Sequence, residues 1–276
     1  MILTLSPSGL TTYQECPTKF LYSNIQRLRQ LEEKRDKMDR GSLFHKMLEK
    51  HYTGIINKVS LNEIVLEVTN YARETYRNDE YNDIEMVEAC IANYQEYAIY
   101  YADDGYEPLA AEVPFSRIIY SEGEHKIVIE GVIDLIARKA QGAISTDLII
   151  DHKTSDKRDM YPTILGNQFK AYAWATEKNV VIKNDIGFQK SYGPADRFHR
   201  HVLNYTKEHL EEWRESVIYH GLELINFIEK DYFPMRESSC FRCQFRKICE
   251  STPDSREWKI KSTYKTGEPH DIFARS

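Results

Sequence analysis

The most constraining feature of the sequence is a group of three strand-like segments in its middle. They are LAAEVPFSRII from residue 109, KIVIEGVIDLIARK from residue 126 and TDLIIDHK from residue 146, separated by turn-prone residues. Short apolar runs joined by turns predict an antiparallel meander. A helix over about 161–178 and two more strand-rich segments, 180–190 and 198–205, are expected after it. The order sheet, helix, sheet predicts an α/β fold with a central mixed sheet flanked by helices.

Helical signals dominate the first third of the chain. Helix starts at Ser6-Pro7-Ser8 and at Cys16-Pro17 predict a short N-terminal helical hairpin. Apolar residues at helical spacing over 40–52 predict another helix, and Ser60 with Glu63 forms a capping box that opens the next. The tyrosine-rich segment 84–101 completes this helical block.

The C-terminal third begins with one long predicted helix. Thr206 is a favourable N-cap, and the helix is expected to end near Lys230. Farther on, prolines and a glycine in a polar stretch discourage regular structure. We therefore expect one domain over 1–252, with a helical insertion over 55–105, followed by a polar tail over 253–276.

Composition sets further bounds on function. The 276 residues are 41% hydrophobic, which predicts a sizeable buried core. No apolar run approaches the roughly 18–20 residues needed to cross a bilayer, and the N-terminus lacks the marks of a signal peptide. We therefore expect a cytoplasmic protein without a membrane partner. The net charge of -6 argues against coating of nucleic acid by bulk positive charge, but it leaves room for a local basic groove.

Carboxylates interrupt two of the apolar strands. Since successive strand residues alternate faces, Asp134 shares one face with Glu130 while apolar residues occupy the other. A buried aspartate needs a cation or a metal as its partner. Asp151 and Lys153 share one face of the next strand. Two carboxylates and an amine fit phosphodiester hydrolysis, in which the carboxylates hold Mg²⁺ or Mn²⁺ and the amine positions the attacking water. The alternative is an edge-strand ion pair worth about 0–1 kcal/mol.

The residues around these carboxylates resemble a known family. Gly131-Val132-Ile133-Asp134, Asp151-His152-Lys153, Gln168 and Tyr172 are similar to the successive motifs of RecB-like nucleases in the PD-(D/E)XK superfamily. Upstream, RGSLFHKMLE around His45 resembles the histidine motif of that family. The resemblance implies a restriction-endonuclease-like core and a metal-dependent deoxyribonuclease.

The same resemblance implies roles for single residues. The implied ligands of Mg²⁺ or Mn²⁺ are His45, Asp134, Asp151 and the carbonyl of His152. Lys153 would be the catalytic lysine, acting with the two aspartates. Gln168 and Tyr172, four residues apart on one helix, would face the site together. These roles have alternatives: His45 as an ordinary helix histidine, and Gln168 with Tyr172 as a hydrogen-bonding pair on an amphipathic helix. Glu112 in AAEVPF resembles an often acidic position, but a solvated strand glutamate fits nearly as well.

Four of the five cysteines form a second candidate site. They are Cys16 near the N-terminus and Cys240, Cys243 and Cys249 in CFRCQFRKIC. In a compartment that keeps thiols reduced, metal ligation or burial is favoured over disulfides. Four thiolates fit an iron-sulfur cluster or Zn²⁺, and spacing alone does not separate the two. The split arrangement is similar to iron-sulfur exonucleases of the CRISPR-associated type, so the resemblance implies a [4Fe-4S] cluster that joins 1–30 to 231–252.

The resemblance implies an exonuclease acting on single-stranded DNA, with 5′ to 3′ as the favoured polarity. Phe241 and Phe245 interleave with basic residues and fit either contact with a single strand or charge balance for the cluster. A structure-dependent endonuclease, a non-catalytic DNA-binding subunit with the cluster and a zinc-stapled scaffold are the alternatives. No GxxxxGK[ST] loop is present, so a helicase would be a separate partner, as would CRISPR adaptation proteins. DNA repair, recombination, phage DNA processing and CRISPR adaptation all stay open as settings, and RNA stays open as a substrate.

Overall fold

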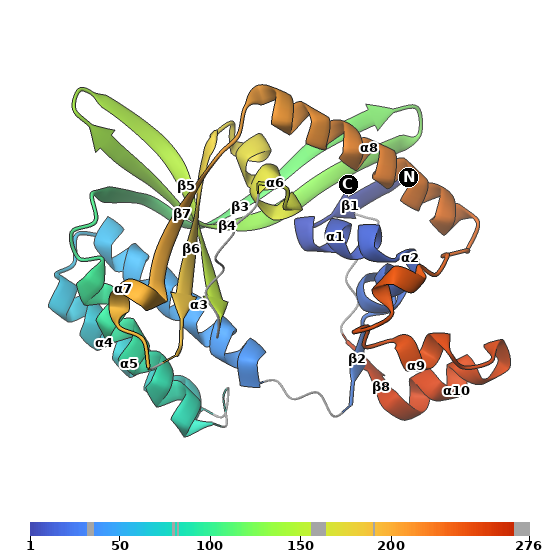
Figure 1. The fold of residues 1–276 in the computed structure, drawn as a ribbon, viewed down its shortest axis with the longest axis horizontal. Helices are drawn as coiled ribbons and strands as arrows, with labels where there is room; N and C mark the ends of the chain where they lie inside the picture. The colour runs from blue at the N-terminus through green and yellow to red at the C-terminus, as the bar shows by residue number, and fades with distance from the viewer. Residues whose placement is uncertain (32–35, 79–80, 82, 156–163, 190, 268–276) are drawn as a thin grey trace. The chain divides into compact units, whose positions relative to one another are not determined.

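The middle of the chain folds as the expected mixed sheet (Figure 1). The computed structural model describes residues 1–31, 36–78, 81, 83–155, 164–189 and 191–267. Within these ranges the strand order is β1-β4-β5-β6-β7, and β3 also pairs with β4. The strands of the central segment are β3 (Tyr106–Glu122), β4 (His125–Gln141), β5 (Ile144–Ser155), β6 (Val180–Gly187) and β7 (Phe198–Asn204). β5 is antiparallel to β4 and parallel to β6, which confirms the prediction of a mixed sheet.

The chain divides into two compact units. The first comprises Met1–Glu33, Ser116–Gly131 and Lys207–Ser276, and the second comprises Lys34–Phe115 and Val132–Thr206. β3 and β4 contribute residues to both units, because each strand crosses a boundary between them.

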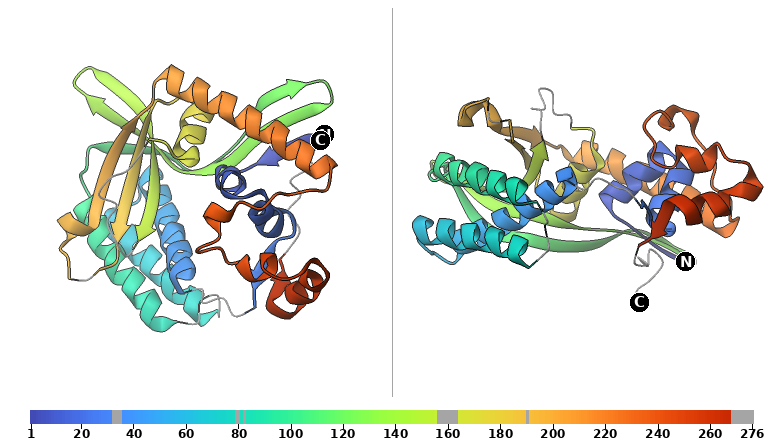
Figure 2. Two further views of the ribbon diagram at one scale, coloured as in Figure 1. Left: turned by 45° about the vertical axis from the view of Figure 1, so that its right-hand side comes forward. Right: turned by 90° about the horizontal axis from the view of Figure 1, so that it is seen from below.

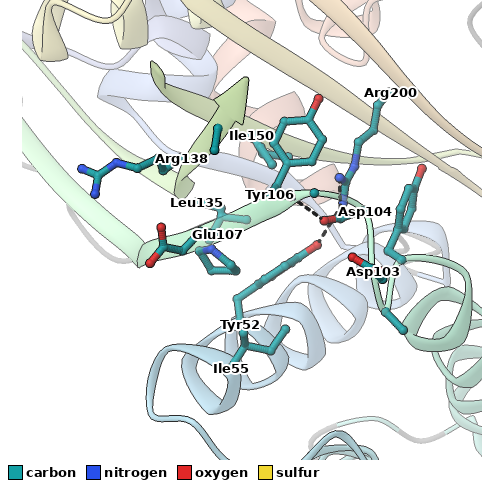
Figure 3. Close-up of a pocket in the computed structure, with 15 residues that line it drawn as sticks. Tyr52, Ile55, Asp103, Asp104, Tyr106, Glu107, Leu135, Arg138, Ile150 and Arg200 are labelled. Carbon is teal, nitrogen blue, oxygen red and sulfur yellow. Dashed lines mark hydrogen bonds and ion pairs between the residues drawn. The ribbon is translucent and has the colours of Figure 1, made fainter. Parts of the chain in front are cut away.

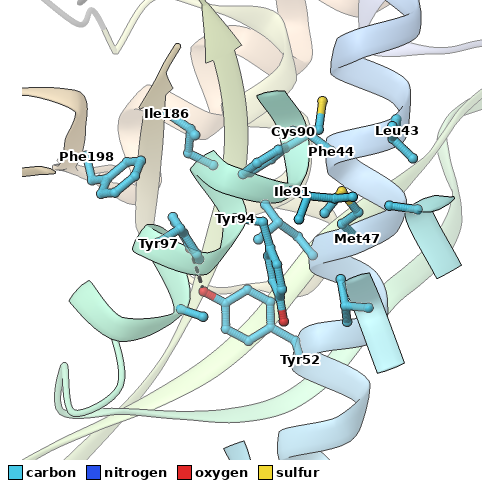
Figure 4. Close-up of a cluster of buried hydrophobic side chains, with 14 of the residues drawn as sticks. Leu43, Phe44, Met47, Tyr52, Cys90, Ile91, Tyr94, Tyr97, Ile186 and Phe198 are labelled. Atoms are coloured by element: carbon cyan, nitrogen blue, oxygen red, sulfur yellow. Dashed lines mark hydrogen bonds between the residues drawn. The ribbon is translucent and has the colours of Figure 1, made fainter. Parts of the chain in front are cut away.

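Three long helices of the second unit cover one face of its strands (Figure 2). They are α3 (Asp36–Ile56), α4 (Leu61–Arg77) and α5 (Ile84–Tyr100). Leu43 and Met47 of α3 lie beside Ile91 of α5 in one buried cluster that also contains residues of β4 to β7 (Figure 4). The capping box of Ser60 and Glu63 opens α4 as predicted. The segment predicted as an insertion therefore contributes to the main core of this unit.

Helix α6 (Asn167–Thr176) lies on the opposite face of the sheet. Ile150 of β5 belongs to the cluster under α3–α5, whereas its neighbour Asp151 contacts Gln168 of α6. Successive strand residues alternate faces, so α6 and α3–α5 cover different faces. The helix begins later than expected, with Gly166 as its N-cap, and residues 161–163 of the prediction lie outside the described residues. The short helix α7 (Pro194–Arg197) precedes β7.

In the first unit the N-terminus adds a strand that the sequence did not reveal. β1 (Ile2–Leu5) pairs in parallel with the start of β4, from Lys126 to Ile129. The helices that follow are α1 (Pro7–Glu15), α2 (Pro17–Phe20) and the π-helix η1 (Leu21–Ile25). The Ser6 hydroxyl accepts the N–H of Gly9 at 3.0 Å, which confirms the predicted helix start.

The long helix α8 (Lys207–Glu229) matches its prediction and packs closely on β4. A Cβ added at Gly221 would lie 2.5 Å from Cδ1 of Ile127, so a larger residue would require the Ile127 side chain to move. Gly221 therefore allows the close packing of these two elements.

The expectation of an irregular tail after residue 252 is wrong for its described part. This part contains α10 (Pro253–Thr263) and β8 (Tyr264–Thr266), after η2 (Glu237–Ser239) and α9 (Arg246–Cys249). Pro253 stands in the first turn of α10, where a missing N–H costs nothing, so the proline begins a helix. β8 pairs with β2 (Leu28–Gln30), and the buried ring of Tyr264 lies 5.7 Å from that of Phe245. Pairing and burial thus override the weak local preference.

A membrane-spanning segment was not expected, and across the described ranges we find no helix with the length and apolar character to traverse a bilayer.

Gly54 on α3 provides a test of this helix packing. A Cβ at this position would lie 2.6 Å from Cγ1 of Ile64 on α4. We expect Gly54→Ala to lower the free energy of unfolding by about 1–3 kcal/mol because of overpacking, although alanine is the better helix former. Urea denaturation measures this change.

Ile64→Ala supplies the matched control, since it removes the side-chain atoms that the new methyl would meet. The double variant should lose less stability than the sum of the two single variants. Strictly additive losses would show that the two helices do not approach as described.

Candidate active site

Strands β4 and β5 separate beside two carboxylates. Their paired register ends at Leu135 and Ile150, whereas β5 stays paired with β6 as far as Ser155. Next to Leu135, the side chain of Asp134 takes over as the partner of β5, because its Oδ2 accepts the N–H of His152 at 2.7 Å. A side chain thus replaces the backbone pairing at the predicted catalytic segment.

Asp151 is the most deeply buried group of the site. Its side chain is fully buried, and Oδ2 lies 2.8 Å from Nζ of Lys153. Its Oδ1 accepts the Gln168 amide at 3.1 Å, and that amide also donates to the Tyr172 hydroxyl at 2.8 Å. The ion pair considered as an alternative therefore exists, but in a buried site rather than at an exposed edge. Gln168 and Tyr172 form the hydrogen-bonded pair and also reach the site.

His45 joins the site from α3. Its Nδ1 lies 3.6 Å from Oδ2 of Asp134, and its ring centroid lies 6.3 Å from that of His152. The structure thus brings together His45, Asp134 and the segment 151–153, which are more than 100 residues apart at their extremes.

Burial controls the charge of these groups. Loss of solvation raises the pKa of Asp151 to about 7, although the charge of Lys153 opposes the rise. Burial also raises the pKa of Asp134, against the His152 N–H and the Lys153 charge. Burial lowers the pKa of His45, which favours a neutral imidazole with a free lone pair. The site therefore holds two carboxylates that would gain from an added positive charge.

Glu112 is a further acidic residue of the site that received little weight from the sequence. It lies on β3 with φ of 49°, in the left-handed region that strands rarely contain. Burial raises its pKa, the charges of Asp134 and Glu49 add to the rise, and together they bring the pKa to about 7. The string AAEVPF reveals the carboxylate, but nothing in it signals the backbone conformation at this position.

The donor set fits a divalent cation. Oδ2 of Asp151 is a buried oxygen without a well-formed hydrogen bond, and carboxylate oxygens with a neutral imidazole suit Mn²⁺ or Mg²⁺. Across the ranges that the structure describes, no group of three or more His, Cys, Asp or Glu side chains is already arranged to hold a metal. Instead Lys153, Gln168 and the His152 N–H contact the aspartate oxygens. A bound cation would replace some of these contacts.

The four predicted cysteine ligands all lie in the first unit as free thiols. Cys16 is buried, and its Sγ lies 3.4 Å from the backbone N of Arg236, whose carbonyl accepts the Cys240 thiol at 3.7 Å. Burial raises the pKa of Cys249, charges on Cys243, Cys16 and Cys240 add to the rise, and together they bring the pKa to about 11. The thiols are therefore close enough to interact. Among the described residues, however, no three or more such side chains are already arranged to hold a metal, and this is true of the four cysteines as well.

The aromatic residues near these cysteines differ in accessibility. Phe241 is 82% exposed, whereas Phe245 is fully buried and packs on Tyr22 with 5.5 Å between ring centroids. The interpretation that both rings could meet the bases of a single strand is therefore wrong for Phe245, which belongs to the core of this unit.

The raised pKa of Asp151 predicts a pH-dependent stability. The folded state binds the carboxyl proton of Asp151 more tightly than the unfolded state does. The stabilisation that results is complete below pH 3.8 and is lost as the pH rises to about 7. In metal-free protein, the stability of Asp151→Asn relative to wild type should therefore increase with pH across this window, by about 1 kcal/mol or more. Urea denaturation at pH 5 and pH 8 in EDTA measures the difference.

Mg²⁺ or Mn²⁺ should cancel this pH effect in wild type and leave the variant unchanged, because the cation stabilises only the charged carboxylate. A stability difference that is flat with pH in EDTA would contradict the account of Asp151.

Comparison with known families identifies the superfamily of the chain. Residues 4–250 match the PD-(D/E)XK nuclease superfamily, a span that includes all the candidate residues above. A search of the curated proteins returned no match. Nucleases of this superfamily typically use divalent metals such as Mg²⁺ or Mn²⁺, in agreement with the donor set. The chain belongs to the PD-(D/E)XK nuclease superfamily.

Proposed function

We propose that this chain is a metal-dependent DNA exonuclease that acts on single-stranded DNA, with 5′ to 3′ polarity. The observation that carries the proposal is the meeting of Asp134, Asp151 and Lys153 beside His45 where β4 and β5 separate. Superfamily membership supports the hydrolase chemistry. The choice of DNA, of single strands and of polarity rests on the resemblance to RecB-like nucleases.

The proposed mechanism gives each side chain a role. His45, Asp134, Asp151 and the His152 carbonyl would hold Mg²⁺ or Mn²⁺, which supplies positive charge for the phosphate and acidifies bound water. Lys153, 34% exposed at its side chain and 2.8 Å from Asp151, would orient the attacking water. Gln168 fixes Asp151 by donating to its Oδ1.

We also propose that Cys16, Cys240, Cys243 and Cys249 bind a [4Fe-4S] cluster, with Zn²⁺ as the alternative. The free thiols and the proximity of Cys249 to the other three cysteines, which their electrostatic interaction reflects, support a site made of four cysteines. The Arg236 N–H beside Cys16 would favour a thiolate there. Such a cluster would link the N-terminal helices to the cysteine-rich C-terminal segment. In this proposal it is structural, and the catalytic carboxylates lie in the other unit.

A structure-dependent endonuclease remains the second candidate because the same donor set serves it equally. Biological setting and partner proteins, such as a separate helicase or CRISPR adaptation proteins, are proposed only from the resemblance. Repair, recombination and phage DNA processing suit the same chemistry.

Lys153→Ala and Asp151→Ala should each reduce cleavage of end-labelled single-stranded DNA by about 10²-fold or more, because each removes a group needed in the transition state. Lys139→Ala, on β4 and bonded to Tyr106, is the matched control and should cleave like wild type. Timed digestion with Mn²⁺ measures the rates.

Linear and circular substrates distinguish the two nuclease candidates. An exonuclease leaves circular single-stranded DNA intact, and cleavage of the circle would favour the endonuclease. Wild-type levels of cleavage by both active-site variants would contradict the proposed function.

Anaerobically purified protein should absorb near 400 nm and contain about four iron atoms per chain. Cys243→Ser should lose this absorbance, whereas Cys90→Ala should keep it, since Cys90 is buried in the second unit. Zinc without this absorbance would show that the cysteines bind the alternative metal instead of the cluster. The absence of both iron and zinc would refute the site.

A further inference from the structure

The face of the sheet opposite the catalytic side chains carries a row of polar residues. His152 of β5 is the register partner of Asn184 of β6, which in turn is the partner of Arg200 of β7. Ile150 and Ile182, two positions before His152 and Asn184, belong to the cluster under α3–α5, so the row faces those helices. Polar side chains in an apolar core are costly unless they are well bonded. The row therefore needs an explanation.

The imidazole of His152 is held on two sides. The Tyr52 ring of α3 stacks on it with 5.4 Å between centroids and an angle of 7°. In the plane of the ring, the Asn184 amide lies 2.8 Å from Nδ1. That amide also donates to the Tyr97 hydroxyl at 2.8 Å, and Tyr97 bonds to the Tyr52 hydroxyl at 2.7 Å (Figure 4). The ring, amide and hydroxyls form one continuous network.

The backbone of the same residue belongs to the active site. The His152 N–H donates to Asp134 at 2.7 Å, and Asp151 and Lys153 flank it in sequence with side chains on the catalytic face. His152 is buried. Its ring, held by Tyr52 and Asn184, thus restrains the peptide unit between the two candidate catalytic side chains.

Tyr52 is itself anchored on its far side. Its hydroxyl lies 3.4 Å from Nη2 of Arg200, which pairs with Asp104 at 2.6 Å. These residues line a cavity of about 300 Å³, and Figure 3 shows Tyr52 at its wall. A smaller side chain at position 52 would remove the stacking contact without overpacking, but it would enlarge this cavity and cost stability, so folding of the variant is measured together with binding.

We propose that Tyr52 and Asn184 are positioning residues that set the affinity of the active site for its divalent cation by holding the His152 imidazole. The proposal rests on the proposed function, because it assumes that Asp134, Asp151 and the His152 carbonyl bind the cation. Residues that orient metal ligands without touching the metal commonly change its affinity by about 10- to 100-fold. Neither Tyr52 nor Asn184 belongs to a motif in the sequence that signals this role.

Mn²⁺ binding to DNA-free protein, followed through the electron paramagnetic resonance of free Mn²⁺, tests the proposal independently of cleavage. Tyr52→Leu should weaken binding about tenfold, whereas Tyr52→Phe, which keeps the stacked ring, should bind within about twofold of wild type. Phe198→Leu is the matched control, since it removes another buried ring of the same core that has no stacking contact with His152. It should lose stability in urea and keep its Mn²⁺ affinity.

Asn184→Leu provides a second variant of similar size in case Tyr52→Leu does not fold, and it should also weaken Mn²⁺ binding about tenfold. If wild type binds Mn²⁺ and cleaves DNA but every folded variant binds Mn²⁺ equally, the positioning role is refuted and the proposed function stands. Equal losses in Tyr52→Leu and Phe198→Leu would also refute it, because a general packing defect would then explain both. If wild type neither binds Mn²⁺ nor cleaves DNA, the proposed function fails and the positioning role fails with it.

Discussion

The candidate site depends on two carboxylates, one fully and one largely buried, with little positive charge around them. Asp151 is fully buried beside one lysine, and Asp134 accepts a backbone N–H where β4 and β5 part. Burial disfavours the charged form of both groups in the absence of further positive charge, and their pKa values are raised for this reason. The fold tolerates this unfavourable burial at one place, which is how functional sites commonly differ from the rest of a core.

Strand pairing and helix packing hold the two carboxylates in place. The parallel pairing of β5 with β6 continues past the point where β4 leaves, so the candidate catalytic segment stays paired with β6. On the face away from the candidate site, α3–α5 cover the same strands with a large apolar cluster. The polar row through His152 lies beside that cluster and connects it to the backbone of the candidate site. The cysteine-bearing unit has a separate hydrophobic cluster, which contains Phe245 and Ile248.

Local sequence patterns predicted much of this fold and site. The alternation in β4, the capping box at Ser60 and the DHK string each follow from local rules, and all appear as expected. β1 and β8 were missed because they depend on partners distant in sequence, which local patterns cannot register. α10 was missed for a local reason, since Pro253 was interpreted as a helix breaker although it stands in the first turn of the helix. Glu112 and Tyr52 were missed or weighted weakly because a left-handed φ and a ring stacked on His152 exist only in the folded chain.

The central claim is that the carboxylates at the separation of β4 and β5 form a cation site. Anomalous diffraction from crystals soaked in Mn²⁺ tests it most directly. The account predicts a manganese peak bonded to carboxylate oxygens of both Asp134 and Asp151, with Lys153 moved off Asp151. A peak that avoids both residues at saturating Mn²⁺, or no peak in this unit, would contradict the account.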